Sequence, residues 1–268
     1  MADPCYIFIG GLHRSGTTLL ANILAEHPEA TGFRNTGAPE DEGQHLQSVY
    51  PPAKEFGGAG RFCFDACSFL DETSPLVTEE NRAKLTAEWG RHWDASKRWR
   101  IEKSPPNLVR GRFLQAMFPG CHLVFIVRHP AAVALATHKW GEIPIPDLLG
   151  HWAAGHRRML ADLPHLQNIT LLRYEEVIAD PEGAIAKLSV RLGLAPFRFT
   201  QQVQKDSNAR YFAQWEAWRA EQGGKAHEQE LETFLRQFGY SLSVPYVVER
   251  LQVPARRTPK PETRNLNI

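Results

Sequence analysis

The sequence predicts an α/β fold in which a mostly parallel sheet lies between two layers of helices. Two observations predict it. Short apolar runs, which are typical of buried strands, alternate with longer segments whose apolar residues recur every three or four positions, as they do in helices. After Phe197 the strand-like runs stop, and only helical patterns follow. We therefore expect a single three-layer sandwich over residues 1–253, with extra helices at its C-terminal end.

Four segments carry the pattern of a buried strand. Tyr6–Ile9 and His122–Val127 are continuous apolar runs, which suit strands that are covered on both faces. Trp99–Lys103 and Ile169–Leu172 are shorter runs of the same kind. Because helical segments separate these runs, right-handed crossovers would make the strands parallel.

Helical patterns fill the intervals between and after the strands. The expected helices cover residues 17–27, 78–96, 104–118, 130–140, 147–163, 181–192, 209–221 and 227–238. Pro28 ends the first helix, whereas Ser104 and Pro105 favour the start of the third as N-cap and first-turn residue. In the helix 209–221 we expect Phe212 and Trp215 to be core residues.

Two segments show neither the apolar pattern of a strand nor that of a helix. Residues 31–66 are rich in Gly, Pro and mixed charge, and an irregular stretch of this length inside a domain is usually functional. We expect it to form a substrate-binding or lid loop. Residues 254–268 are rich in Pro and Arg, which favours a flexible tail.

Composition and charge exclude several classes of protein. The 31 Lys and Arg residues balance 30 Asp and Glu residues, a net charge of +1, which argues against a protein that coats nucleic acid or an anionic membrane. We expect no membrane span and no signal peptide. The spacing of Cys5, Cys63, Cys67 and Cys121 is poor for zinc, so we expect free thiols, no bound metal and a cytoplasmic location.

The loop after the first strand has the layout of a phosphate cradle. Gly11–Thr18 reads GLHRSGTT and joins a buried strand to a helix N-terminus, whose unpaired N–H groups and dipole attract anions. Its glycines fit the spacing of a nucleoside-triphosphatase P-loop, but Thr17 stands where that motif has Lys. Arg14 supplies the positive charge instead. A plain strand-to-helix turn needs no Arg, Ser and Thr pair, so we favour an anion-binding loop.

The strand–RSGTTLL–helix segment resembles the 5′-phosphosulfate loop of sulfotransferases that use 3′-phosphoadenosine 5′-phosphosulfate (PAPS). Its Arg resembles the branch that includes tyrosylprotein sulfotransferases and many bacterial members. Three further segments resemble the family in the same order, namely Ile101–Pro105 (IEKSP), Phe125–Pro130 (FIVRHP) and Leu172–Pro181 (LRYEEVIADP). The resemblance spans about residues 6–195 and implies a P-loop-like sulfotransferase fold with PAPS as sulfuryl donor.

The resemblance also implies which residues bind the donor. The loop would hold the phosphosulfate, Arg128 the 3′-phosphate and Tyr174 the adenine. A Ser that is usual eight residues after the Arg is replaced here by Ala136, so that either Thr137 takes its place or Arg128 acts with other donors. The candidate donor-binding residues are His13, Arg14, Ser15, Gly16, Thr17, Thr18, Arg128, Thr137 and Tyr174.

Sulfuryl transfer needs stabilisation of charge on the departing oxygen, for which Arg14 and Lys103 are the candidates. The acceptor hydroxyl also needs a base. Glu42 is our first candidate and His45 the second, because both belong to the densest polar cluster of the long loop. Tyrosylprotein sulfotransferases carry a Glu about twenty residues past the loop Arg, but this chain has Arg34 and Asn35 there, so the base does not follow from the resemblance.

The sequence thus predicts transfer of a sulfuryl group from PAPS to a hydroxyl acceptor, by in-line displacement and with release of 3′,5′-ADP. Two alternatives stay open. A kinase or ATPase would have to work without the loop Lys, and a catalytically inactive 3′,5′-ADP-binding protein would account for Ala136 and the unassigned base. Small molecules, sugars and peptide tyrosines are all compatible acceptors, and no oligomeric state is predicted.

Overall fold

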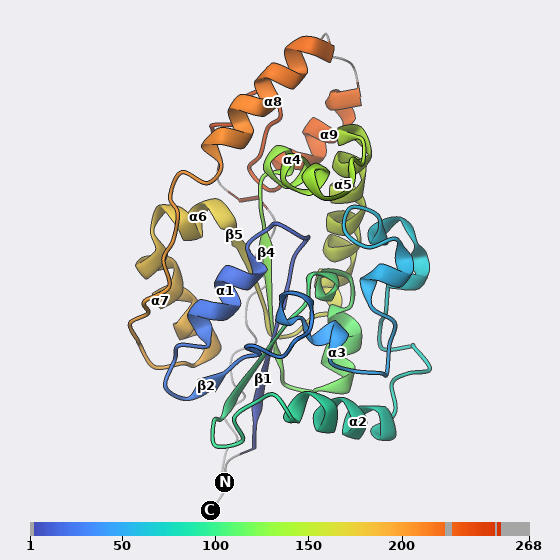
Figure 1. The fold of residues 1–268 in the computed structure, drawn as a ribbon, viewed down its shortest axis with the longest axis vertical. Coiled ribbons are helices and arrows are strands. Elements are labelled where there is room, and N and C mark those ends of the chain that lie inside the picture. Colours follow the sequence, from blue (N-terminus) through green and yellow to red (C-terminus); the bar gives the residue numbers. More distant parts are fainter. Residues whose placement is uncertain (1–2, 223–226, 250, 253–268) are drawn as a thin grey trace, which may run out of the picture.

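A five-stranded sheet in the spatial order β2-β3-β1-β4-β5 forms the centre of the protein (Figure 1). The structure is a computed structural model that describes residues 3–222, 227–249 and 251–252. All neighbouring strands run parallel, as the sequence predicts for strands joined by helical crossovers. The strands are β1 (Cys5–Gly10), β2 (Ala30–Thr31), β3 (Trp99–Lys103), β4 (His122–Val127) and β5 (Ile169–Arg173).

Four of these strands are the predicted ones, and β2 was missed. β3 and β4 have the predicted bounds, while β1 and β5 extend slightly beyond theirs. β2 pairs with β3 only through Ala30 and Thr31. A strand of two residues shows no alternation of apolar and polar positions, and so it leaves no signal in the sequence.

Helices cover both faces of the sheet (Figure 1). They are α1 (Thr17–Leu24), α2 (Glu79–Gly90), α3 (Gly111–Met117), α4 (Pro130–Gly141), α5 (Ile145–Asp162), α6 (Tyr174–Ala179), α7 (Pro181–Leu192), α8 (Ala209–Gln222) and α9 (His227–Arg236). On one face Ile7 and Ile9 of β1 belong to a cluster with Leu20 of α1 and Ile185 of α7. The alternating neighbour Phe8 faces the opposite layer.

The second layer is the larger one. Phe8 and Phe125 pack there with Trp89 of α2, Phe113 of α3 and Trp152 of α5, all fully buried. The helices after the sheet, α8 and α9, extend this layer beyond α4 and α5 at the top of the molecule in Figure 1. The predicted sandwich with extra C-terminal helices is therefore confirmed, and Phe212 and Trp215 of α8 are buried as expected.

Two predicted helices have the wrong extent. The single helix expected over residues 104–118 is a 3₁₀ helix at Pro105–Val109 followed by α3. Ser104 does not cap it, because its hydroxyl bonds to Glu102 and to the backbone N–H of Gln44. α2 ends at Gly90, six residues before the predicted end at Ser96.

The early end of α2 has a local cause. The Asp94 carboxylate accepts hydrogen bonds from the backbone N–H and hydroxyl of Ser96, at 2.9 and 2.7 Å. Such local side-chain bonds compete with the helical ladder. The first helix likewise ends at Leu24 rather than His27.

The segment 31–66 is largely irregular, as predicted, but short 3₁₀ helices interrupt it. They are η1 (Pro39–Asp41), η2 (Gly43–His45), η3 (Ala53–Phe56) and η4 (Phe62–Phe64). Runs of one turn have no period that a sequence pattern can reveal. The role of this segment as a substrate or lid loop stays a prediction, and the predicted flexible tail 254–268 lies outside the described residues.

Two further findings concern only the described part of the chain. No helix there is both long and apolar enough to cross a membrane. The same residues contain no cluster of three or more His, Cys, Asp or Glu side chains that could hold a metal ion. The four cysteines are free thiols, of which Cys63 and Cys121 are buried.

Candidate active site

The carboxyl ends of the parallel strands bring the predicted site segments to one edge of the sheet. Gly11–Gly16 follows β1, Lys103 ends β3, Arg128 follows β4 and Tyr174 follows β5. This edge is where open α/β sheets bind ligands. A cavity of about 340 Å³ opens there, and the residues that line it are His13, Arg14, Gly16, Thr17, Thr18, Leu19, Glu40, Glu42, Pro105, Arg128, Trp140 and Tyr174.

Backbone geometry explains the glycines of the loop. Gly16 has a φ of 99°, in the left-handed region, and a Cβ there would lie 2.6 Å from the Tyr174 ring. A Cβ at Gly11 would lie 2.5 Å from the carbonyl oxygen of Ile126. Arg14 is also left-handed, with a φ of 68°. The loop therefore turns tightly against β4 and Tyr174, which leaves no room for side chains at these two glycines.

The start of α1 presents unpaired polar groups. Gly16 provides no side-chain cap, and the first helical bond runs from the N–H of Leu20 to the oxygen of Gly16. Among the described residues, the buried Ser15 Oγ and His13 Nδ1 have no hydrogen-bond partner. Burial, together with the charges of Lys103 and His45, lowers the pKa of His13 to about 4, so this imidazole is neutral at physiological pH. Such a cradle fits an oxyanion.

Arg14 projects at the mouth of the cavity. Its guanidinium carbon lies 4.9 Å from the centroid of the Trp140 ring, near the C-terminal end of α4. Trp140 is 54% exposed although it is a large aromatic residue. A cation over an indole face is a favourable contact that orients the guanidinium without neutralising it. Sequence reasoning did not assign Trp140 to the site.

Arg128 is held by three hydrogen bonds to other parts of the chain. Its Nε donates to Asn208 Oδ1 at 2.8 Å, its Nη1 to the carbonyl oxygen of Arg14 at 2.8 Å and its Nη2 to the carbonyl oxygen of Ser207 at 3.5 Å. Its guanidinium carbon lies 4.2 Å from the centroid of the Tyr174 ring. The Tyr174 hydroxyl in turn bonds to Ser207 Oγ at 2.8 Å. The cation is therefore fixed beside the loop after β1.

Ser207 and Asn208 were not predicted as site residues. The Asn208 Nδ2 donates to Glu175 Oε1 at 2.7 Å, and the same carboxylate accepts from the Tyr240 hydroxyl at 2.6 Å. The backbone N–H of His129 also donates to Glu175 Oε1. The only sequence signal was a pair of small polar residues directly before α8, a common helix start that does not by itself indicate a site.

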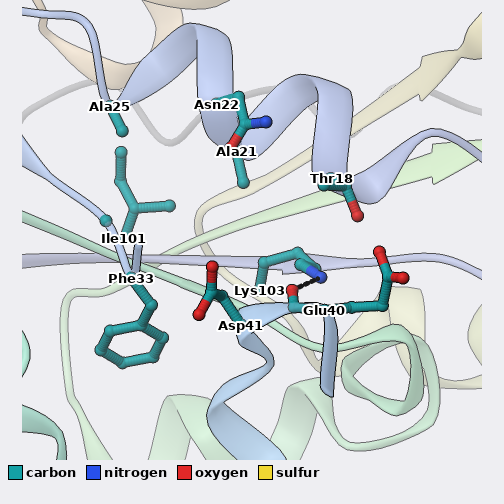
Figure 2. A pocket seen from close by; sticks show the side chains of 10 residues that line it. Thr18, Ala21, Asn22, Ala25, Phe33, Glu40, Asp41, Ile101 and Lys103 are labelled. Atoms are coloured by element: carbon teal, nitrogen blue, oxygen red, sulfur yellow. Dashed lines mark hydrogen bonds between the residues drawn. The ribbon is translucent and has the colours of Figure 1, made fainter. Parts of the chain in front are cut away.

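A second, smaller cavity of about 150 Å³ adjoins the first (Figure 2). Its lining residues are Thr18, Ala21, Asn22, Ala25, Gly32, Phe33, Glu40, Asp41, Ile101 and Lys103, so the two cavities share Thr18 and Glu40. Lys103 lies at the end near these shared residues, where its Nζ donates to the carbonyl oxygen of Glu40 at 2.7 Å. Lys103 is 4% exposed.

The Glu42 carboxylate lies beside Lys103, with 3.5 Å between Glu42 Oε1 and Lys103 Nζ. Glu42 is only 5% exposed, and burial raises its pKa above the ordinary value in spite of Lys103 and a hydrogen bond from Gln44. The His45 Nε2 is 3.9 Å from Glu42 Oε2. Burial and the charges of Lys54 and Lys103 lower the pKa of His45.

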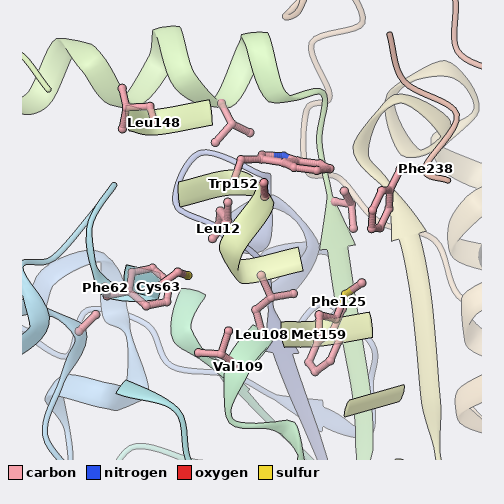
Figure 3. Close-up of a cluster of buried hydrophobic side chains, with 14 of the residues drawn as sticks. Leu12, Phe62, Cys63, Leu108, Val109, Phe125, Leu148, Trp152, Met159 and Phe238 are labelled. Atoms are coloured by element: carbon pink, nitrogen blue, oxygen red, sulfur yellow. The ribbon is translucent and has the colours of Figure 1, made fainter. Parts of the chain in front are cut away.

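Buried aromatic residues and a thiol anchor the segment 31–66 next to these groups. Phe62 and Cys63 pack in the large core cluster with Leu12, directly under the loop after β1 (Figure 3). A Cβ at Gly155 of α5 would lie 2.8 Å from Cys63 Sγ and 3.2 Å from Leu12, so this glycine permits the close approach. The donor-loop residue Leu12 and the segment 31–66 therefore share one core.

Three predicted site residues line neither cavity. Ser15 is fully buried within the loop, and His45 lies 3.9 Å from Glu42. Thr137 is 3% exposed on α4, with its methyl 3.4 Å from where a Cβ would stand at Gly60. None of the three is among the described residues that line either cavity.

A family model described as "Sulfotransferase family" matches residues 4–201 of the chain. The chain belongs to the sulfotransferase family. The enzyme class predicted from the sequence is the one that this family carries. Because the matching family is one of sulfotransferases, the match argues against the alternative of a kinase or ATPase.

Individual relatives are distant. The chain is 25% identical over 226 residues to the nodulation protein NoeE of Sinorhizobium fredii. The aligned region covers 72% of this chain and 51% of NoeE. The chain thus spans about half the length of this curated relative.

Two solved structures show the same fold. Sulfotransferase STF9 from Mycobacterium avium superposes with a TM-score of 0.55 and 12% identity, covering 95% of this chain and 79% of STF9. The sulfotransferase domain of the Synechococcus PCC 7002 olefin synthase gives a TM-score of 0.50 and 20% identity, covering 79% of this chain and 88% of that domain. These likenesses support the fold alone.

Proposed function

We propose that this sulfotransferase moves a sulfuryl group from PAPS to a hydroxyl acceptor by in-line displacement, in the cavity at the carboxyl edge of its sheet. The observation that carries the proposal is the convergence of an uncapped helix start, two arginines and a buried Lys–Glu pair around that edge. PAPS supplies the sulfuryl group when it is bound, and 3′,5′-ADP is the product. Positioning and charge stabilisation are what such a transfer needs from a protein.

The residues of this chain divide the work between two anionic ends of the donor. Gly16, Thr17 and Thr18 offer backbone N–H groups and hydroxyls to the phosphosulfate, and the buried Ser15 and His13 add unpaired polar atoms to the same loop. Arg128 faces the 3′-phosphate, and the Tyr174 ring beside it is a stacking surface for adenine. Ser207 and Asn208 orient Arg128, a role we consider better supported than one for Thr137.

Arg14 and Lys103 stabilise the negative charge that develops on the departing oxygen. Arg14 lines the larger cavity and Lys103 the smaller one, and Thr18 lines both. Glu42 accepts the proton of the acceptor hydroxyl at its carboxylate. Its position on the larger cavity and its raised pKa favour it over His45, which lines neither cavity among the described residues.

The smaller cavity is the proposed entrance for the acceptor. Ala25, Phe33 and Ile101 line one end of it, and Lys103 and Glu40 stand at the other end, which meets the larger cavity (Figure 2). Between these ends the lining includes Ala21 and the polar residues Asn22 and Asp41. A cavity of about 150 Å³ holds one six-membered ring. A hydroxyl on a ring of that size fits this space, whether it belongs to a small molecule, a sugar or a peptide tyrosine.

Thermal unfolding with 3′,5′-ADP, ADP or ATP–Mg²⁺ tests the donor site. A ligand at 100 times its dissociation constant stabilises a protein by about 2.7 kcal/mol, so the midpoint should rise by several degrees with 3′,5′-ADP and much less with the others. Arg128→Ala should abolish the rise. Arg98→Ala is the matched control, because Arg98 also stacks on an aromatic ring, that of Trp99, but at the opposite end of β3. Equal stabilisation by ADP would overturn the 3′-phosphate site.

The alternative of an inactive 3′,5′-ADP-binding protein needs a second experiment. PAPS is incubated with the protein and a panel of phenols and sugar alcohols, and formation of 3′,5′-ADP is measured. We expect turnover with at least one acceptor and its loss in Glu42→Gln. Binding of 3′,5′-ADP without any turnover would support the inactive alternative. The resemblance to the tyrosylprotein branch and the cytoplasmic location both stay predictions.

A further inference from the structure

A series of buried hydrogen bonds leads from β3 to the Glu42 carboxylate. The Ser104 hydroxyl donates to Glu102 Oε1 at 2.6 Å and accepts from the backbone N–H of Gln44 at 2.9 Å. The Gln44 side chain then donates from Nε2 to Glu42 Oε2 at 2.5 Å. All four residues are 5% exposed or less. Water therefore has little access to these bonds, and each partner depends on the next.

The Gln44 amide has a defined orientation. Its Oε1 accepts the backbone N–H of Ala53 at 2.8 Å, at the start of η3. A flipped amide would direct its NH₂ at that N–H and its oxygen at the Glu42 carboxylate, which are two repulsive contacts. Gln44 Nε2 is therefore a fixed donor that faces Glu42.

The far end of the series is equally constrained. Glu102 Oε2 accepts from Asn107 Nδ2 at 2.5 Å, and the same NH₂ donates to the carbonyl oxygen of Ile9 in β1. The backbone of Gly43 lies directly against this carboxyl group, since a Cβ on Gly43 would stand 2.4 Å from Glu102 Oε1. The indole N–H of Trp89 donates to the Gly43 oxygen at 2.9 Å. The turn Glu42–Gln44 is thus held between the end of β3 and the helix α2.

Resting on the assignment of Glu42 as the base, we propose that Gln44 is a positioning residue that holds the Glu42 carboxylate in its reactive orientation, and that Glu102 and Ser104 hold Gln44. Gln44 touches neither cavity among the described residues, so it acts through Glu42 and not on a ligand. Its amide donates to the ionised carboxylate and favours that form.

The other charged groups around Glu42 come from three elements. Lys103 on β3 favours the carboxylate, whereas Glu40 on η1 and the buried Glu102 on β3 disfavour it. His45 on η2 lies 3.9 Å away. Because these groups stay in place when Gln44 is replaced by Leu, the loss of one hydrogen bond should raise the pKa of Glu42 further.

The test is a titration of glutamate side-chain carboxyls by ¹³C NMR on the full chain, with the Glu42 signal assigned by its absence in Glu42→Gln. In Gln44→Leu we expect the Glu42 pKa to rise by about one unit. Gln47→Leu is the matched control, because Gln47 lies in the same segment and bonds to the backbone of Gln44 and Tyr50 but not to Glu42. An unchanged Glu42 pKa in Gln44→Leu, or an equal rise in Gln47→Leu, would overturn the proposal.

A second pair of variants keeps the proposal testable if Gln44→Leu does not fold. Ser104→Ala removes the hydroxyl that holds Gln44 and should raise the Glu42 pKa by a smaller amount, and Ser104→Thr, which keeps the hydroxyl, should restore it. An equal Glu42 pKa in Ser104→Ala and Ser104→Thr would contradict the proposal that the Ser104 hydroxyl holds Gln44.

The rates separate this inference from the proposed function. If Glu42→Gln retains full transfer, the assignment of the base fails whatever Gln44 does. If Glu42→Gln abolishes transfer, Gln44→Leu should lower kcat about tenfold or more, leave the KM for PAPS unchanged and move the acid limb of the kcat–pH profile upward with the Glu42 pKa. A normal kcat and profile in Gln44→Leu would remove Gln44 from the mechanism and leave Glu42 in it.

Discussion

The two sides of the active-site cavity are built in different ways. The proposed donor side consists of residues that closely follow strands, with Arg14 after β1, Arg128 after β4 and Tyr174 after β5. The other side consists of Glu40 and Glu42, which belong to a long segment without a strand of its own after β2. Cations therefore come from the sheet and carboxylates from the segment 31–66.

Residues other than glycine with positive φ occur on both sides of the cavity, at Arg14 on one side and in the segment 31–66 on the other. In the segment 31–66 three residues other than glycine adopt positive φ, namely Asn35 at 54°, Glu40 at 51° and Asp41 at 49°. The Asp41 carboxylate accepts hydrogen bonds from the N–H groups of Asn35 and Thr36 and from the Thr36 hydroxyl. Although burial acts to raise it, the pKa of Asp41 is lowered by these bonds. The comparison shows that the acidic side relies on side-chain bonds where the donor side relies on the sheet.

The largest effect is expected on the donor side. Arg14→Ala should lower the rate of 3′,5′-ADP formation from PAPS by about 10²–10³-fold, because a preorganised cation at the developing charge is lost. Thermal unfolding should stay cooperative, since the Arg14 side chain is exposed. Arg34→Ala is the control, as Arg34 is an exposed residue that bonds only to the carbonyl oxygen of Asn22 in the described structure. Near-normal turnover in Arg14→Ala would contradict the proposal that Arg14 stabilises charge on the departing oxygen.

On the acidic side the largest effect concerns stability and pH. Burial raises the pKa of Glu102 to about 7, against hydrogen bonds from Ser104 and Asn107. A carboxyl with a raised pKa stabilises the fold below its unfolded pKa, and this contribution is lost as the pH rises through the folded value. Between about pH 4.5 and 7 the free energy of unfolding of the wild type should fall by about 3 kcal/mol through this group, and Glu102→Gln should lack that decrease.

Buried histidines provide the opposite slope in the same experiment. The pKa values of His13 and His156 are lowered to about 4 and those of His129 and His151 to about 3, mainly by burial. Their contribution is present above the unfolded pKa and is lost as the pH falls. Urea unfolding from pH 4 to 8 should therefore show a steeper loss of stability on acidification in Glu102→Gln than in the wild type, because the Glu102 contribution offsets part of the histidine loss between about pH 7 and 4.5. Parallel curves of the two proteins over that range would contradict the raised pKa.

The clamp on the turn Glu42–Gln44 gives a prediction of intermediate size. Gly43→Ala should destabilise the protein by about 1–3 kcal/mol, because its Cβ would enter the space of Glu102 Oε1. Gly90→Ala, at the end of α2, meets no atom within 4 Å and should be neutral or stabilising by less than about 1 kcal/mol. Denaturant unfolding measures both, and equal stability of the two variants would argue against a tight fit at Gly43.

The smallest effect is expected at a residue that acts only through Arg128. Asn208→Ala should weaken binding of 3′,5′-ADP about tenfold, because Arg128 loses its Nε partner while its bond to the Arg14 oxygen remains. Asn168→Ala is the control, since Asn168 bonds to the Gly120 oxygen on the surface. Isothermal titration gives the two dissociation constants. Equal affinities would mean that Asn208 has no part in the donor site.

The same division separates what the sequence predicts from what it does not. The place of Arg14, Lys103, Arg128 and Tyr174 at the sheet edge could be predicted, because they end or closely follow strands whose apolar runs are visible in the sequence, while their roles toward the donor stay a proposal. A residue that lies next to the C-terminal end of a strand in the sequence also lies at the carboxyl edge of the sheet in space. The family comparison supports this part of the chain, since it matches residues 4–201.

The remaining site residues depend on contacts across long stretches of sequence. Asn208 reaches Arg128 across 80 residues, and Gly43 lies against Glu102 although no local pattern links the two. Glu42 could be named as a candidate because it is a carboxylate in a polar segment, but its burial beside Lys103 accompanies contacts of its turn with Glu102 and Ser104, about 60 residues away in sequence. No periodicity encodes such packing, and the resemblance did not supply the base.

The hydrogen bond from Arg128 Nη1 to the Arg14 oxygen ties the two arginine-bearing segments directly to each other. The distance between these two segments is therefore fixed by the protein before a nucleotide binds. A nucleotide that carries its two anionic groups at another spacing, or only one of them, can satisfy one end but not both. Selection among nucleotides would then depend on length as well as on charge, and simply adding negative charge to a ligand would not make it bind better.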